Sequence, residues 1–175
     1  MSPAMKKIDS FIRDIPDFPK PGINYKDITP LLQDPAALRE TVARLMDLIG
    51  DIKIDKVVGV ESRGFLLGAI LAEKLNAGFV PVRKSGKLPY KTYAEVYDLE
   101  YGKDILEIHQ DAIKKGESVL LHDDVLATGG TARTACNLIE KMGGKIVQCN
   151  FLIELSYLKG ELKLKDYDVR SLIGY

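Results

Sequence analysis

The sequence predicts an α/β fold in which a mainly parallel central sheet is flanked by helices. Short runs of β-branched and apolar residues recur along the chain, and segments with the apolar spacing of a helix lie between them. Strands that alternate with helices favour parallel pairing, so helices are expected to cover both faces of the sheet. The length of 175 residues is that of one domain, 1–175, with a large buried core.

The composition argues against some classes of binding partner. The 25 basic and 25 acidic residues balance, so no overall field would attract nucleic acid or an anionic membrane. The N-terminus lacks the apolar stretch of a signal peptide, and no apolar run approaches the ~20 residues of a membrane helix. Cys136 and Cys149 lack metal-ligand spacing and are interpreted as core thiols in a reducing compartment. We therefore expect a soluble, cytoplasmic protein that acts on small molecules and binds neither nucleic acid nor membrane.

Two helices and a proline-rich stretch are predicted in the N-terminal part. Residues Lys6–Arg13 predict a short helix, and residues 15–30 after it must be extended or turned at each proline. An amphipathic helix follows, with Asp34 placed to cap its start and Gly50 placed to end it. Its apolar residues recur at steps of three and four, namely Leu38, Val42, Leu45 and Ile49.

The central part predicts two strands, a helix between them and a long excursion. Lys56–Val60 is a β-branched run typical of a strand buried on both faces of a parallel sheet. The apolar residues 64–76 predict a helix. Phe79–Arg83 predicts a second strand, in which Pro81 indicates an edge or irregular position. Residues 84–103 are rich in lysine and tyrosine, which favours an excursion such as a β-ribbon rather than core.

The C-terminal half continues the alternation. Apolar spacing predicts a helix over residues 104–116 and then a strand at Val119–His122. A further helix carries Ala132 to Met142 and ends at Gly143 and Gly144, and residues 145–155 predict another strand. This order completes the predicted parallel sheet.

One rim of the sheet is expected to carry the site, because active sites of open parallel sheets lie beyond the carboxyl ends of the strands. Asp123 and Asp124 can act together only where their strand ends and the chain begins to turn. The glycines that follow allow backbone N–H groups of Ala127–Thr131 to converge on an anion at the start of a helix. The segments expected on this rim are residues 61–64, 83–87 and 123–131.

This combination of donors and acceptors suits a sugar phosphate. Backbone N–H groups and threonine hydroxyls can bind the phosphate, whereas carboxylates accept hydrogen bonds from vicinal hydroxyls. The loop lacks the lysine ending of a Walker loop and the spacing of a dinucleotide fingerprint. The alternative is a solvated acid pair and a glycine turn that serve only as a helix entry.

The segment HDDVLATGGTA, residues 122–132, closely resembles the phosphoribosyl-pyrophosphate (PRPP) binding motif of type I phosphoribosyltransferases. Further segments are similar to the adenine phosphoribosyltransferase family, namely FPKPGINYKDITPLL, GVESRGFLLG, VRKSGKLPYKT, YDLEYGKDILEIHQDAI and FLIELSYLKGELKL. The resemblance implies the type I phosphoribosyltransferase fold. It also implies a small base-binding hood at residues 1–34 and a flexible catalytic loop at residues 84–103.

A function is implied by the same resemblance. The expected enzyme is a glycosyltransferase, specifically a pentosyltransferase of purine salvage, that joins adenine to PRPP and gives AMP and pyrophosphate. Magnesium is expected as Mg²⁺ carried by PRPP, with no direct ligand from the protein. A homodimer is expected, in which Arg83 and Lys84 reach the neighbouring subunit's site. A cis peptide bond between Glu61 and Ser62 is expected as well.

The resemblance also implies residue roles. Glu100 is the expected catalytic residue, transferring a proton at N7 of adenine, and Tyr101 beside it covers the site. Asp123 and Asp124 are expected to bind the ribose. The other expected contacts are Ala127, Thr128, Gly129, Gly130 and Thr131 for the 5-phosphate, Ser62, Arg63, Arg83, Lys84 and Lys87 for pyrophosphate, and Ile23, Tyr25 and Lys26 for adenine.

Two positions depart from the family pattern. Lys26 stands where arginine is common, and the two cations differ in stacking and in forked hydrogen bonding. His122 stands where an apolar residue is usual, and is interpreted as a hydrogen-bonded histidine at a strand end. The alternatives are the same reaction with hypoxanthine, xanthine or orotate, a PRPP-binding regulatory protein, and an NTP-binding module. Without the resemblance, the RKSGK segment is a solvated face and Glu100 a surface acid.

Overall fold

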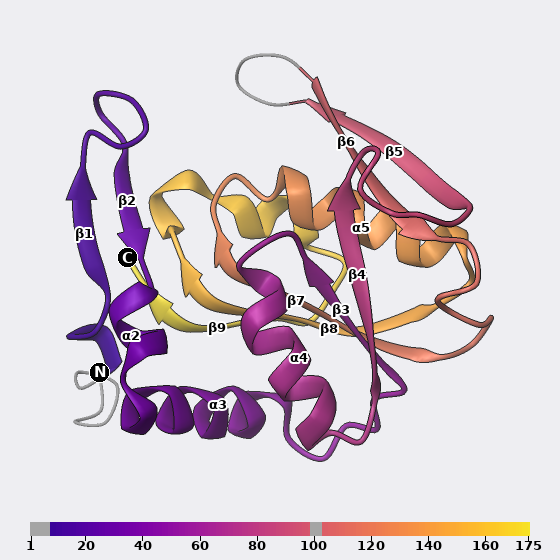
Figure 1. Cartoon of the computed structure of the whole chain (residues 1–175), viewed down its shortest axis with the longest axis horizontal. Helices are drawn as coiled ribbons and strands as arrows, with labels where there is room; N and C mark the ends of the chain where they lie inside the picture. The colour runs from indigo at the N-terminus through magenta and orange to yellow at the C-terminus, as the bar shows by residue number, and fades with distance from the viewer. Residues whose placement is uncertain (1–7, 99–102) are drawn as a thin grey trace. The chain divides into compact units, whose positions relative to one another are not determined.

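The computed structural model describes residues 8–98 and 103–175. The chain divides into two compact units, Met1–Asp47 and Leu48–Tyr175 (Figure 1). That all of it forms one domain stays a prediction. Within the described ranges, no helix combines the length and the apolar character needed to cross a lipid bilayer.

The first unit begins with a β-hairpin. A turn between the two strands contains a cis peptide bond between Phe18 and Pro19, and the backbone N–H of Gly22 donates to Asp17 Oδ1 at 2.7 Å. Of the short helix predicted over Lys6–Arg13, the structure describes helical backbone at Ile8 and Asp9. The elements of this part are β1 (Arg13–Pro16), β2 (Asn24–Asp27), α2 (Thr29–Gln33) and α3 (Pro35–Ile49).

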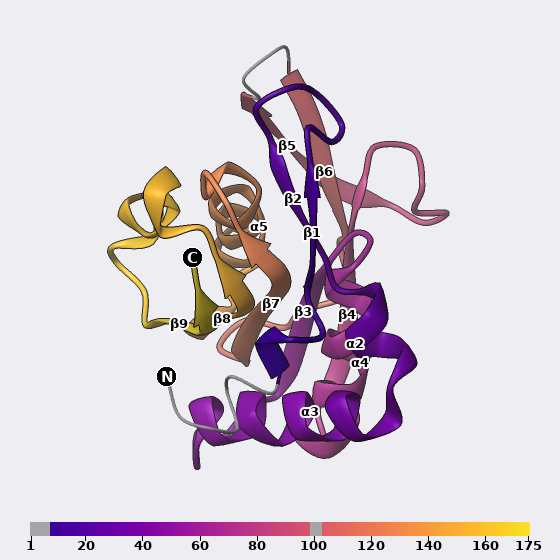
Figure 2. The same ribbon diagram turned by 90° about the vertical axis from the view of Figure 1, so that its left-hand side faces the viewer.

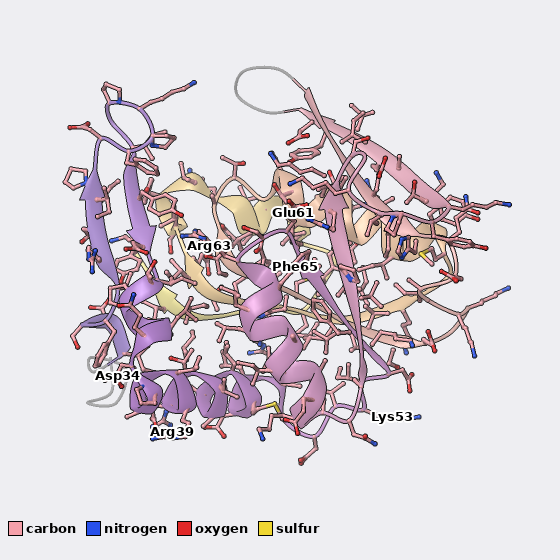
Figure 3. The ribbon with its side chains drawn as sticks, in the orientation of Figure 1. Asp34, Arg39, Lys53, Glu61, Arg63 and Phe65 are labelled. Atoms are coloured by element: carbon pink, nitrogen blue, oxygen red, sulfur yellow. The ribbon has the colours of Figure 1, made fainter. Side chains whose placement is uncertain are left out.

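Helix α3 begins and ends where the sequence predicts. Asp34 lies at its start (Figure 3), and Asp34 Oδ1 accepts hydrogen bonds from the backbone N–H groups of Ala36 at 2.9 Å and Ala37 at 2.8 Å. These two bonds satisfy donors that the first turn of a helix leaves without a backbone partner. Gly50 follows the last helical residue with φ of 65°, a left-handed conformation that costs glycine little.

The second unit is built on a mainly parallel sheet. Helix α4 covers one face of that sheet and α5 the other (Figures 1 and 2). Its elements are β3 (Lys56–Val60), α4 (Gly64–Lys74), β4 (Gly78–Lys84), β5 (Thr92–Asp98), β6 (Lys103–His109), β7 (Ser118–Leu126), α5 (Gly130–Lys141), β8 (Lys145–Glu154), the 3-10 turns η1 (Ser156–Leu158) and η2 (Gly160–Leu164), and β9 (Val169–Gly174).

The strand order in the described residues is β5-β6-β4-β3-β7-β8-β9. Strand β3 pairs in parallel with β4 and β7, and β8 pairs in parallel with β7 and β9. Strand β6 pairs antiparallel with both β4 and β5. The predicted fold class is therefore confirmed, and the carboxyl ends of β3, β4 and β7 lie at one rim.

The core of this unit forms on both faces of the sheet, and one apolar cluster lies between the sheet and helix α5. Leu121, Phe151 and Ile139 each have 0% exposure and belong to one apolar cluster. Burying a side chain of this size stabilises the fold by about 1.5–3 kcal/mol relative to its exposed state. Cys136 and Cys149 are free, buried thiols in the same cluster, with their Sγ atoms 3.8 Å apart, as predicted for core thiols.

The helix predicted over residues 104–116 is wrong. Residues Lys103–His109 form β6, which pairs antiparallel with β5 along its whole length. Leu106 and Ile108 are buried, and this alternation is the period of a strand. A short apolar run cannot be assigned by periodicity alone, and here the backbone pairing with β5 decides.

Of the excursion predicted at residues 84–103, Thr92–Asp98 forms β5, which pairs with β6, and this β5–β6 ribbon projects from the sheet (Figure 1). It does not stand wholly outside the core, because Tyr93 and Tyr97 pack against the apolar cluster. In β4, Pro81 pairs with β3, whereas the antiparallel pairs with β6 begin only at Arg83. Pro81 therefore occupies a local edge, where its missing N–H removes no ladder bond. Helix α2, both 3-10 turns and β9 were not predicted.

Candidate active site

A cavity lies where β7 passes into α5. It is lined by Asp123 and by Val125–Ala132, a group that includes all five predicted phosphate contacts. Gly129 is the N-cap of α5 with φ of 75°, so it makes the turn, whereas Gly130 already belongs to the helix. The N–H groups in the first turn of a helix lack intrahelical partners and attract anions. The cavity therefore offers anion-binding donors with one carboxylate beside them.

The prediction that the two acids lie at the end of a strand is wrong. Strand β7 continues to Leu126, so both Asp123 and Asp124 lie within the strand. Asp123 faces the cavity, whereas Asp124 is 5% exposed and its Oδ2 lies 2.6 Å from Nε of Arg63. A buried carboxylate is tolerated here because a guanidinium compensates its charge.

Burial dominates the electrostatics of this acid pair. Desolvation raises the pKa of Asp123 well above its ordinary value, and the neighbouring Asp124 carboxylate raises it further. Desolvation also raises the pKa of Asp124, but the positive charge of Arg63 opposes that effect. A ligand that offers hydroxyl donors or positive charge would therefore be favoured at Asp123.

The turn that follows β3 brings a second rim segment against the acid pair. The peptide bond between Glu61 and Ser62 is cis, as predicted. A Cβ on Gly64 would fall 2.7 Å from Asp123 Oδ1, so only glycine allows this approach to β7. Glu61, Arg63 and Phe65 lie together at the turn that opens α4 (Figure 3).

The Glu61 carboxylate binds the end of β4 and the basic segment after it. Its Oε2 accepts hydrogen bonds from Arg83 Nε at 3.2 Å and from the backbone N–H of Lys84 at 3.0 Å, and its Oε1 pairs with Lys87 Nζ. Burial works to raise the pKa of Glu61, but Lys87, the Lys84 N–H and Arg83 together lower it. Sequence reasoning assigned Glu61 no role, although its place directly after a buried strand was a signal.

The ribbon contacts α5, the helix that begins at the predicted phosphate loop, Ala127–Thr131. Asn137 Nδ2 of α5 donates to Glu95 Oε1 of β5 at 3.0 Å. Nearer the start of α5, Tyr97 packs against the apolar cluster that contains Ala132. Tyr97 Oη also lies 3.4 Å from Asp104 Oδ2.

Asp104 pairs with Lys84, whose Nζ lies 2.8 Å from Asp104 Oδ2. Sequence reasoning missed both Asp104 and Tyr97, because ribbon pairing and not spacing brings them here. Glu100 and Tyr101 lie outside the described residues, and their roles stay predictions.

The predicted adenine contacts belong to the first unit. Ile23 is 41% exposed, and the ring of Tyr25 meets that of Phe18 edge-on, with their centroids 5.2 Å apart. Lys26 Nζ lies 2.5 Å from Asp14 Oδ1, and the lysine side chain is 8% exposed. Within this unit, strand pairing holds the Lys26 cation on the hairpin.

His122 lies inside β7 rather than at a strand end. The residue has 0% exposure, and its Nδ1 lies 3.3 Å from Asn150 Oδ1. Its Nε2 has no hydrogen-bond partner among the described residues. Desolvation lowers the pKa of His122 to about 4, so the ring is neutral near physiological pH. The expectation of a satisfied histidine is therefore correct for one ring nitrogen only.

The pair of Arg63 and Asp124 is expected to stabilise the fold. In a double-mutant cycle with Arg63→Met and Asp124→Asn, we expect a coupling free energy of unfolding of about 1–3 kcal/mol, because either single change leaves a largely buried charge unpaired. Urea unfolding at neutral pH measures this quantity.

The control cycle uses Arg170 and Asp168, which lie 2.8 Å apart but are 55% and 38% exposed. Their coupling is expected to stay below about 1 kcal/mol because water screens the pair. Equal coupling in both cycles would contradict the compensation assigned to Arg63.

The family model for the phosphoribosyl transferase domain matches residues 26–173, which is more than half of the chain. The chain therefore belongs to the phosphoribosyltransferase family. It is 68% identical to the adenine phosphoribosyltransferase of Christiangramia forsetii over 97% of this chain and 99% of the relative. The corresponding enzyme of Thermotoga maritima is 56% identical over 98% of this chain and 100% of the relative.

Solved structures of adenine phosphoribosyltransferases are also similar to this chain. The adenine phosphoribosyltransferase of Rhodothermus marinus superposes with a TM-score of 0.94 at 52% identity, covering 98% of both chains. The Giardia lamblia enzyme, crystallised with 9-deazaadenine, superposes with a TM-score of 0.94 at 40% identity, covering 99% of both chains. Within its family, the chain groups with the adenine phosphoribosyltransferases.

Proposed function

We propose that the protein transfers the 5-phosphoribosyl group of PRPP to adenine, giving AMP and pyrophosphate. The observation that carries the proposal is the cavity lined by Asp123 and Val125–Ala132 at the start of α5. Membership of the family and relatives named adenine phosphoribosyltransferase support it. The reaction breaks the bond from C1 to pyrophosphate and forms a bond from C1 to N9. Positive charge therefore develops on the ribose and negative charge on the leaving group.

The ribose phosphate is bound by β7 and the loop after it. The N–H groups at the start of α5 and the hydroxyls of Thr128 and Thr131 donate to the 5-phosphate. Asp123 faces the cavity and accepts a hydrogen bond from a ribose hydroxyl. Asp124 does the same once Arg63 has exchanged this carboxylate for pyrophosphate.

Pyrophosphate is bound at the rim by one hydroxyl group and four cations. These belong to Ser62, Arg63, Arg83, Lys84 and Lys87. The Glu61 carboxylate pairs with Arg83 and Lys87. A departing polyanion carries more negative charge than one carboxylate, so it can take over these cations as the C1 bond breaks. While these cations are bound, they and the Lys84 N–H lower the pKa of Glu61 and keep its carboxylate charged.

The base is bound by Ile23, Tyr25 and Lys26, and Glu100 transfers a proton at N7 while N9 attacks. The support for Glu100 comes from the ribbon, because Tyr97 packs against the apolar cluster that contains Ala132 in the first turn of α5. Glu100 follows Tyr97 by three residues, and such a segment spans at most about 10 Å. Tyr101 covers the reacting atoms.

Magnesium enters as part of the substrate. The hydroxyl and phosphate oxygens of PRPP are hard ligands of the type that Mg²⁺ prefers, and Asp123 offers a carboxylate beside them. When bound, Mg²⁺ neutralises charge on the leaving pyrophosphate. We infer a cytoplasmic homodimer in which Arg83 and Lys84 serve the neighbouring site, with neither nucleic acid nor membrane as a partner.

Product formation with different bases tests this function. The purified protein is incubated with PRPP, Mg²⁺ and either adenine, hypoxanthine, xanthine or orotate, and nucleotide and pyrophosphate are quantified. We expect AMP from adenine, with kcat/KM for the other bases lower by about 10⁴-fold, because a site that reads an amino group rejects bases that lack it.

Two results would contradict the assignment. Preferential formation of another nucleotide would show that the base is different, which Lys26 in place of arginine makes a specific concern. Tight PRPP binding without product from any base would indicate a PRPP-binding regulatory protein instead. The same mixture without Mg²⁺, with a chelator added, is the control for the metal.

A further inference from the structure

The loop that lines the phosphate cavity rests against a second segment, residues 155–164, which does not line that cavity. A Cβ on Gly129 would fall 2.3 Å from the carbonyl oxygen of Gly160. Conversely, a Cβ on Gly160 would fall 2.1 Å from the carbonyl oxygen of Ala127 and 3.0 Å from the nitrogen of Gly129. The two backbones are therefore in direct contact, and neither Gly129 nor Gly160 has space for a side chain.

The supporting segment is held at both ends. At its start, the backbone N–H of Leu155 donates to the carbonyl of Leu126, the last residue of β7, at 2.9 Å. At its end, Leu164 has 0% exposure and belongs to the same apolar cluster as Ala132 of α5. Turn η2 thus packs on α5, and its position relative to β7 and α5 is set by the core.

The two glycines are required for different reasons. Gly129 has φ of 75°, so its own backbone conformation favours glycine. Gly160 is absent from the residues with positive φ, so an alanine would suit its backbone. Only the closeness of Ala127 and Gly129 excludes a side chain at position 160. A substitution there acts on the phosphate loop from behind without touching the ligand.

We propose that Gly160 is a positioning residue for the 5-phosphate of PRPP, because it lets residues 155–164 support the loop Ala127–Gly129 by direct backbone contact. The proposal rests on the proposed function of that loop. An alanine methyl group must displace the Ala127 carbonyl by about 1 Å to reach the shortest contact that real Cβ atoms show. A displacement of that size in a substrate-positioning group costs up to about 10²-fold in activity.

Steady-state kinetics of Gly160→Ala test the proposal. We expect KM for PRPP to rise by about 10–100-fold, while KM for adenine changes by less than about threefold. Gly174→Ala is the matched control, because that glycine also lacks positive φ and its Cβ would meet only Ser156 Oγ at 3.6 Å. Gly174→Ala should keep the wild-type constants. An unchanged KM for PRPP in folded Gly160→Ala, checked by its thermal transition, would overturn the proposal.

If Gly160→Ala does not fold, amide hydrogen exchange of the wild-type protein tests the role of Gly160 instead. Binding of ribose 5-phosphate should slow exchange within residues 156–164, although this segment does not line the cavity, and should leave the start of β9 unchanged. Unchanged exchange in 156–164 would also overturn the proposal. Failure of the wild-type protein to form AMP would instead count against the proposed function, so the two failures are distinguishable.

Discussion

Replacing Glu100 by glutamine is expected to lower the turnover number for AMP formation by about 10²–10⁴-fold. An amide cannot exchange a proton with N7 of adenine, so N9 would attack without the shift of electron density that the carboxyl group supports. The KM for PRPP should stay within about threefold of its wild-type value, because the phosphate loop and the acid pair are unchanged. Single-turnover mixing with radiolabelled PRPP measures the chemical step directly.

The matched control is Glu95→Gln, the same change at a described residue of β5. Glu95 Oε1 accepts a hydrogen bond from Asn137 Nδ2 at 3.0 Å, and an amide oxygen can accept it equally well. Turnover of Glu95→Gln should therefore match the wild type. If Glu100→Gln also turned over at the wild-type rate, Glu100 would have no part in the mechanism, and its resemblance to the family's catalytic glutamate would be misleading.

Replacing His122 by leucine is expected to change how stability depends on pH. The pKa of His122 is lowered from 6.5 to about 4 in the folded protein by desolvation. As the pH falls below about 6.5, the unfolded chain binds a proton at this ring and the folded protein does not. Folding is therefore progressively disfavoured between about pH 6.5 and pH 4, and below that range both states are protonated.

The size of the effect follows from the shift. A difference of 6.5 against about 4 corresponds to a loss of about 3 kcal/mol across this range. Asp123 and Asp124 have raised pKa values, and their protonation on folding acts in the opposite direction. Wild type and variant both contain the acid pair. Its contribution therefore cancels to first order when their free energies of unfolding are subtracted.

Urea unfolding in steps from about pH 8 to pH 4 measures this difference. The wild type should lose about 3 kcal/mol more than His122→Leu over the acid range, whatever their difference at pH 8. A second variant, His122→Met, fills the space with another shape and should behave like leucine. Parallel curves for wild type and both variants would show that His122 is not the group that titrates.

Local signals allowed most elements to be predicted. Asp34 and Gly50 marked the ends of α3, because capping and left-handed backbone are short-range effects that a few residues determine. Lys56–Val60 was recognised as a strand because a β-branched run suits the interior of a parallel sheet. The error at residues 104–116 arose where the deciding interaction is non-local. Strand β6 exists because β5 pairs with it.

The site shows the same division. The sequence by itself placed Asp123, the glycine turn and the basic residues at one rim, because each follows a predicted strand and active sites of parallel sheets lie beyond the carboxyl ends of the strands. It misjudged the acid pair, since only the ion pair with Arg63 shows that Asp124 is buried within β7.

The sequence by itself predicted the fold class and a sugar-phosphate motif, because both depend on residue types at short spacing, and resemblance of several segments along the chain indicated the family. Only the tertiary structure decided the partners. Glu61 binds Arg83, Asp104 binds Lys84, and the backbone of Gly160 supports the phosphate loop across 31 positions from Gly129 to Gly160. These contacts join residues far apart in the chain, and their distances depend on how the sheet and helices pack, which no local pattern of residues specifies.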